Sequence, residues 1–173
     1  MLAELRPRSL LVDTLYAIQR DTGADLVLIG EFLDTPIRRI RTMCCVHAGQ
    51  RIDDFSFPLA VDPLQEISEG HIVSILAGAR EQFPGCWLLK DFKAESVAAM
   101  PMPLDAGQHP GVIALYWSQA MPSHDPAWPY LTRLIQATQD GSRSLHQEIE
   151  LERSNSADQV RNKVFSDYIQ ETS

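Results

Sequence analysis

Cysteine and histidine are the residues of this 173-residue chain with the most distinctive chemistry. Cys45 and His47 lie two residues apart in a segment that reads as a β-strand, so their side chains share one face. That is the spacing of a metal or redox pair. The other four histidines show no ligand spacing, and a structural zinc site needs four ligands. We therefore predict no metal site and interpret the cysteines as small buried apolar residues.

The three cysteines also define the main catalytic alternative. Adjacent Cys44 and Cys45 would point to opposite faces of a strand, which argues against a disulfide between them and favours a reducing compartment. Cys86 could act with either of them in a small thiol redox enzyme, provided that its thiol is accessible and has a lowered pKa. The Ser-His-Asp run at 123–125 is consecutive, so it cannot converge as a catalytic triad.

The charge and hydropathy of the chain exclude several classes of partner. A formal net charge of −8 argues against general binding of nucleic acids or anionic membranes. No apolar run approaches the roughly 20 residues that a membrane helix needs. The N-terminus lacks the unbroken apolar stretch of a secretory signal. We expect a cytoplasmic protein with neither a nucleic-acid nor a membrane partner.

Three arginines form a local basic cluster in this acidic chain: Arg38, Arg39 and Arg41. Such a cluster could bind an anion or dock a partner. It could equally belong to an edge strand whose charges discourage sheet-to-sheet aggregation. We favour the second interpretation.

Hydrophobic periodicity predicts a chain of alternating helices and strands. Ile40, Cys44 and Val46 are expected to share one face of the second strand. Asp125 is expected to cap the last helix, with Pro126 in its first turn. The predicted helices are 9–21, 62–70, 78–82, 87–92 and a long one from 125, and the predicted strands are 24–32, 37–47, 71–76, 95–102 and 111–118. Residues 48–60 read as an irregular loop.

The long helix carries apolar residues at coiled-coil spacing, interrupted by the weaker positions 138 and 142. This pattern predicts a homodimer built on residues 125–153 and helped by the first helix. The expected interface residues are Leu11, Leu15, Ile18, Leu131, Ile135, Leu145 and Ile149.

Several segments resemble a known family when their order is considered together. They are EISEGHIVSI, GAREQFP followed by WLLKDFKAES, and MPMPL followed by GVIAL. Over residues 9–153 this order resembles a GAF domain, of the kind that precedes PAS, diguanylate cyclase or histidine kinase domains in bacterial sensors. The resemblance implies an α+β fold with a central antiparallel sheet of five or six strands. The first and last helices would pack on one face, while short helices and loops cover a pocket on the other.

The resemblance does not identify a ligand. The Asn-Lys-Phe-Asp-Glu signature of cyclic-nucleotide-binding members is absent, and Cys86 is followed by Trp87 where bilin-binding members have a Cys-His dipeptide. Members that reduce free methionine sulfoxide use separated cysteines around the pocket. No haem, bilin or metal motif is present, so the cofactor is left undefined.

The resemblance places several residues around the expected pocket. We expect a cavity between the sheet and residues 57–61 and 78–92, with Trp87 at its wall. The aromatic candidates for ligand contact are Phe57, Phe83, Trp87 and Trp117, and the polar candidates are His71 and Arg80.

Residues 154–173 read as a helical linker or the start of another domain. A polar break at 155–159 precedes a new amphipathic segment, and KVFSDYIQETS resembles the opening helix of a PAS domain. We therefore expect the natural chain to continue into an output domain beyond Ser173.

Three functions follow from these observations. The leading one is a non-catalytic, dimeric regulatory sensor that binds a small molecule and signals through its long helix. The alternatives are a cysteine-based redox enzyme of the methionine-sulfoxide-reductase type and a dimerisation scaffold with a filled pocket.

Overall fold

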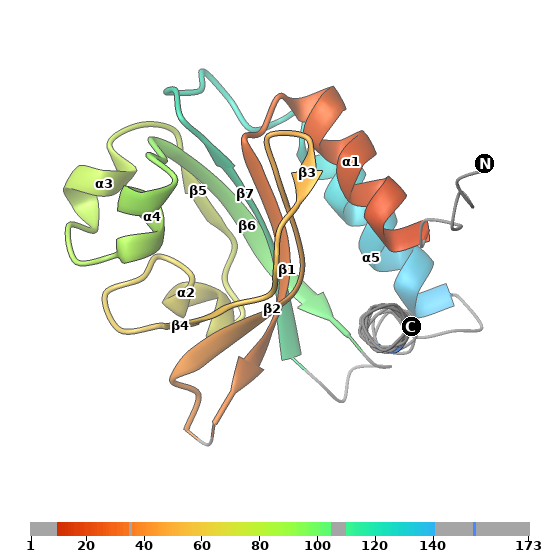
Figure 1. The fold of residues 1–173 in the computed structure, drawn as a ribbon, viewed down its shortest axis with the longest axis horizontal. Helices are drawn as coiled ribbons and strands as arrows, with labels where there is room; N and C mark the ends of the chain where they lie inside the picture. The colour runs from red at the N-terminus through yellow and green to blue at the C-terminus, as the bar shows by residue number, and fades with distance from the viewer. Residues whose placement is uncertain (1–9, 35, 105–109, 141–153, 155–173) are drawn as a thin grey trace, which may run out of the picture.

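A seven-stranded antiparallel sheet forms the centre of the molecule, with helices on both faces (Figure 1). The computed structural model describes residues 10–34, 36–104, 110–140 and 154. The helices are α1 (Leu10–Thr22), α2 (Gln65–Ser68), α3 (Ala79–Gln82), α4 (Trp87–Asp91) and α5 (Trp128–Asp140). The strands are β1 (Leu26–Leu33), β2 (Arg39–His47), β3 (Gln50–Arg51), β4 (Ser56–Pro58), β5 (Val73–Ile75), β6 (Ser96–Pro103) and β7 (Pro110–Trp117).

The strand order is β3-β2-β1-β7-β6-β5, and β4 also pairs with β2. The last strand in the sequence, β7, therefore lies between β1 and β6 at the centre of the sheet. This arrangement confirms the predicted α+β class and the antiparallel sheet. The sheet has more strands than expected because residues 48–60, predicted as a loop, contribute β3 and β4 alongside β2.

Helices α1 and α5 cover one face of the sheet, as predicted for the first and last helices (Figure 1). Leu15, Ile18 and Leu131 are almost completely buried there, in one cluster with apolar residues of the central strands. This burial assigns three of the predicted interface residues to the core, and the dimer itself stays a prediction. An amphipathic helix face that covers its own sheet is not free to pair with a second chain.

The other residues of the predicted dimer interface are either partly buried or outside the described residues. Ile135 is partly buried against the same cluster. The side chain of Leu11, and the whole of Leu145 and Ile149, lie outside the described residues. The boundary predicted between 153 and 154 also falls there and stays a prediction.

The side chains of β2 switch between the two faces of the sheet midway along the strand, because β2 contains a β-bulge. The register between β1 and β2 shifts after Ile29, so that Met43 is an extra residue. Ile40 consequently lies on the face opposite α1 and α5, whereas Cys44 and Val46 lie beneath these helices. The prediction that these three residues share one face was wrong, because it assumed strict alternation along the strand.

The segment before α5 is held by a buried histidine. His124 Nδ1 lies 2.8 Å from Ser74 Oγ of β5, and His124 Nε2 lies 2.7 Å from Ser96 Oγ of β6. Its ring stacks on Trp117 with a centroid separation of 4.9 Å. A neutral imidazole can accept one of these hydrogen bonds and donate the other. His124 thus joins two strands to the chain that leads into α5.

The predicted cap of α5 was wrong. The helix begins at Trp128, and the Asp125 backbone N–H donates to Ser123 Oγ at 3.0 Å in the turn before it. Contacts of His124, made possible only by the tertiary structure, set the path of this turn.

We predict that His124 makes the stability of the fold depend on pH. Burial lowers the pKa of His124, partly opposed by the neighbouring Asp125 carboxylate. The unfolded state therefore binds a proton first as the pH falls below about 6.5, and stability should decrease from that pH downwards. His124→Gln should be less stable than the wild type at pH 8 and should lose less stability between pH 8 and pH 5. Thermal unfolding at both pH values would measure this.

His71→Gln provides the matched control, because His71 is exposed. This control should keep the pH dependence of the wild type. Equal losses of stability in the wild type and in His124→Gln would contradict the assignment.

Candidate functional site

The face of the sheet opposite α1 and α5 is covered in pieces, by α2, α3, α4 and the loops between them (Figure 1). Most side chains in this layer are apolar. Four of the buried groups that are not apolar have positions close to one another, and we call them the polar cluster. They are Cys45 of β2, Asp62 before α2, Cys86 before α4 and Tyr116 of β7.

Asp62 connects two parts of the cover. Its Oδ1 accepts a hydrogen bond from the Leu64 backbone N–H at 2.8 Å, which fixes the turn into α2. Its Oδ2 accepts a hydrogen bond from Cys86 Sγ at 3.1 Å, which ties this turn to the start of α4. The carboxyl group is only 4% exposed. The sequence placed Asp62 at the start of the predicted helix 62–70 and gave no indication of the contact with Cys86.

Tyr116 places a hydroxyl group in the same layer without a hydrogen-bond partner. Among the described residues, it is the one buried side-chain oxygen or nitrogen left unsatisfied. An unsatisfied buried polar group costs about 1–3 kcal/mol. Burial raises the pKa of the Tyr116 phenol well above its usual range, and the nearby Asp62 and Cys86 raise it further. The phenol is therefore a neutral hydrogen-bond donor with nothing to donate to.

The pKa values of the other groups in the polar cluster are also raised by burial. The pKa of Asp62 is raised by burial, against the opposing effect of its hydrogen bonds from Leu64 and Cys86. Burial, followed by the charge of Asp62, raises the pKa of Cys86 to about 12. Burial also raises the pKa of Cys45. Both thiols stay protonated at neutral pH, so the polar cluster can donate hydrogen bonds but does not supply a thiolate nucleophile.

The structure brings some of the predicted pocket aromatics together. Phe57 is buried, and its ring meets that of Trp87 edge to face at 6.3 Å. Phe55 lies 5.8 Å from Trp87 and completes an aromatic group at the surface of the cover. Trp87 is 38% exposed, and Phe83 packs against the same layer.

Three other predicted pocket residues lie elsewhere. Trp117 faces α1 and α5, and its indole Nε1 donates to the Thr22 carbonyl oxygen at 3.0 Å. Its neighbour Tyr116 faces the cover, because successive residues of a strand alternate. His71 is exposed, and Arg80 forms a surface ion pair with Glu95 at 3.3 Å. The predictions for Trp117, His71 and Arg80 therefore do not describe the polar cluster.

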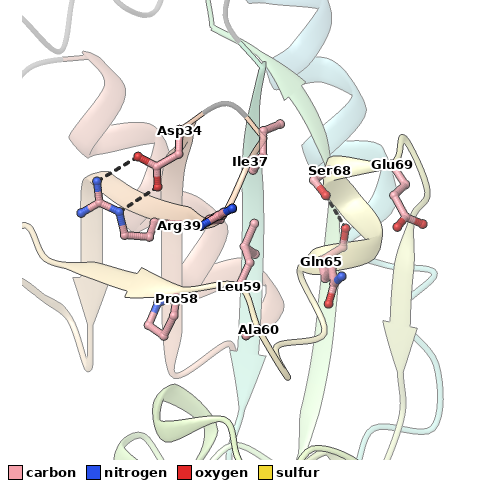
Figure 2. Close-up of a pocket in the computed structure, with 10 residues that line it drawn as sticks. Asp34, Ile37, Arg39, Pro58, Leu59, Ala60, Gln65, Ser68 and Glu69 are labelled. Carbon is pink, nitrogen blue, oxygen red and sulfur yellow. Dashed lines mark hydrogen bonds and ion pairs between the residues drawn. The ribbon is translucent and has the colours of Figure 1, made fainter.

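An open hollow of about 800 Å³ lies between the β1–β2 turn and α2 (Figure 2). It is lined by Pro58, Leu59 and Ala60, in agreement with part of the predicted cavity. No residue of 78–92 lines it, and Trp87 is not in its wall. The hollow and the polar cluster share no residue.

The basic cluster borders this hollow and does not lie on an edge strand. Strand β4 pairs with β2 from Arg39 to Arg41, so β2 is flanked on both sides at this point. Arg39 binds Asp34 through two hydrogen bonds, of 2.9 and 3.1 Å, and Arg41 binds Glu31. The edge-strand interpretation of these arginines was therefore wrong.

Residues 10–34, 36–104, 110–140 and 154 contain no group of three or more His, Cys, Asp or Glu side chains placed to hold a metal ion. Within the same residues, no helix combines the length and the apolar character required to cross a membrane.

We predict that Asp62→Asn stabilises the protein at neutral pH. A carboxyl group whose pKa is raised in the folded state loses stability as the pH rises above its unfolded value of 3.8. Asparagine keeps an acceptor for the Leu64 N–H without a buried charge. Chemical denaturation should show a larger gain in the free energy of unfolding at pH 7 than at pH 4. Asp91→Asn is the control, because Asp91 is exposed, and it should show no such difference. A smaller gain of Asp62→Asn over the wild type at pH 7 than at pH 4 would contradict this account.

Comparison with known proteins identifies the fold from structure and not from sequence. Neither a model of any known protein family nor any curated protein matches this chain. Among solved structures, the GAF domain of a phosphoenolpyruvate-protein phosphotransferase from Acinetobacter has a TM-score of 0.54 at 15% identity. The alignment covers 85% of this chain and 84% of that chain.

Two other structural neighbours come from different kinds of protein. The GAF domain of a two-component sensor histidine kinase from Bacillus halodurans has a TM-score of 0.53 at 11% identity, covering 86% of this chain and 99% of that chain. The free methionine-R-sulfoxide reductase of Neisseria meningitidis, solved with its substrate, has a TM-score of 0.54 at 17% identity, covering 84% and 78%. Identities this low establish the fold alone. The chain therefore has the fold of a GAF domain.

Proposed function

We propose that this chain is a non-catalytic regulatory sensor that binds a small molecule between the sheet and its cover. Its state is passed through α5 to a downstream output domain. The unsatisfied hydroxyl of Tyr116 is the observation that carries the proposal. A ligand that accepts a hydrogen bond from Tyr116 removes the cost of the buried, unpaired donor. It would also have Asp62 and Cys86 as polar neighbours.

The construction of the cover suits ligand entry. Helices α2, α3 and α4 have only four or five residues each, and none has a side-chain cap. Short helices and loops open locally at lower free energy than long packed helices do. The layer above Tyr116 is therefore the part of the fold that can open without disturbing α1 or α5.

Strand β6 offers a path from this layer to α5. Its Val97 and Ala99 pack into the cover side, while Ala98 packs into the cluster beneath α1 and α5. Ser96, the first residue of β6, contacts His124 just before α5. A ligand that prefers one arrangement of the cover would shift the population of α5 positions through these contacts.

The sensor proposal is also consistent with the neighbours that belong to signalling proteins, such as the sensor histidine kinase. The redox alternative has a structural neighbour in the methionine-R-sulfoxide reductase. The raised pKa values of Cys45 and Cys86 argue against it, because thiol catalysis requires a thiolate. We therefore place catalysis second.

The sensor proposal predicts that Tyr116→Phe weakens ligand binding. Native mass spectrometry of the freshly purified chain should reveal a bound small molecule. Tyr116→Phe should reduce its affinity about fivefold, because a buried hydrogen bond contributes about 1 kcal/mol. Tyr130→Phe, which removes a hydroxyl from α5 on the other face, should bind like the wild type. If no molecule is bound and Tyr116→Phe is only more stable than the wild type, the domain is a scaffold.

We also propose that the sensor is a homodimer, formed by the chain beyond α5. Leu15, Ile18 and Leu131 serve the core, so the proposal now depends on Leu145 and Ile149. Light scattering at high micromolar concentration should show a dimer that Leu145→Asp with Ile149→Asp converts to a monomer with unchanged thermal stability of the sheet. A monomeric wild type would contradict it.

A further inference from the structure

The hollow between the β1–β2 turn and α2 is a second candidate site, independent of the proposed sensor pocket. Figure 2 shows Asp34, Ile37 and Arg39 on one side, with Gln65, Ser68 and Glu69 across from them. Its volume of about 800 Å³ falls within the 300–1,000 Å³ typical of small-molecule sites.

The charges around the hollow leave one cation unpaired. Arg39 is engaged by Asp34 in a two-bond ion pair, and the hydrogen bonds from Arg39 lower the pKa of Asp34. Arg38 lines the same hollow, and among the described residues its side chain makes no hydrogen bond or ion pair, although its charge also lowers the pKa of nearby Asp34. A free guanidinium is a strong, directional donor for a carboxylate or a phosphate.

The remaining lining favours a ligand with an apolar body and a single negative charge. Ile37, which is 37% exposed, and Leu59 provide an apolar wall beside Arg38. Glu69 on the α2 side carries a negative charge and would repel a multiply charged anion. The two arginines and two carboxylates of the lining sum to zero formal charge, so the lining opposes a monoanion less than it opposes a phosphate dianion.

We propose that this hollow binds a small monocarboxylate, with the carboxylate on Arg38 and the apolar body against Ile37 and Leu59. The site lies outside the sensor pocket and does not depend on it. Sodium hexanoate is a suitable probe, because it carries both required features and nothing else.

The experiment is a titration of the full, ¹⁵N-labelled chain followed by NMR. Hexanoate at millimolar concentrations should shift the Arg38 side-chain and Leu59 backbone signals in a saturable way. Arg38→Gln should weaken binding about fivefold, the loss expected when an ion pair of an exposed side chain is removed. Arg133→Gln is the matched control, because Arg133 lies on α5 against Tyr130 and should have no effect.

A second variant should act in the opposite direction. Asp34→Asn releases the charge of Arg39 toward the hollow and should tighten binding about threefold. Asparagine tolerates the positive φ of 76° at this position, so the turn should be kept. A gain of affinity cannot arise from misfolding, which separates the charge effect from a loss of structure.

Four outcomes would overturn the proposal. The first is hexanoate binding that does not saturate, and the second is an Arg38→Gln variant that binds hexanoate as tightly as the wild type does. The other two outcomes concern different probes: hexylamine binding as tightly as hexanoate, or inorganic phosphate binding more tightly than hexanoate. Tyr116→Phe should leave hexanoate binding unchanged. If Tyr116→Phe changed hexanoate binding, the probe would be in the sensor pocket and the assignment to the hollow would be rejected. If it does not, the result supports the hollow and does not bear on the sensor proposal.

Discussion

The fold depends on one constraint: the central strands are apolar on both faces, so the sheet must be covered twice. Seven of the eight residues of β1 and seven of the eight residues of β7 are buried. A strand of this kind cannot leave either face to water. The chain covers one face with its first and last long helices and the other with the pieces between β4 and β6. This difference between the two covers decides where function can reside.

The helix side and the cover side consequently play different parts. Beneath α1 and α5 most of the packing is apolar, and the buried His124 has both ring nitrogens hydrogen-bonded. Beneath the short helices, Tyr116 keeps a donor without a partner and Asp62 keeps a buried carboxyl. Groups that cost stability in this way are common where a protein binds something. The unsatisfied Tyr116 and the buried Asp62 are therefore the observations on which the proposed sensor pocket rests.

Electrostatics separates the polar cluster from the hollow beside α2. In the polar cluster, burial raises the pKa of every titratable group, so the thiols and the phenol stay protonated and can donate hydrogen bonds. In the hollow, the charged side chains are exposed, Arg39 is paired with Asp34, and Arg38 makes no hydrogen bond or ion pair among the described residues. We propose a ligand that accepts a hydrogen bond for the first site and a monocarboxylate for the second. The two can be occupied independently, since they share no residue.

The sequence by itself determined the class of fold, the order of its elements and the two-sided covering of the sheet. The order of the elements follows from local hydrophobic periodicity and from turn residues, which act over a few positions of the chain. The fold class and the two-sided covering were implied by the resemblance to a GAF domain. Only the tertiary structure decided which residues meet. The bulge at Met43 reversed the faces of β2, and strand alternation put Tyr116, not Trp117, into the cover. The pairing of Asp62 with Cys86 joins positions 24 residues apart. Such contacts are set by register and packing between distant segments, for which the spacing of residues in one sequence carries no signal.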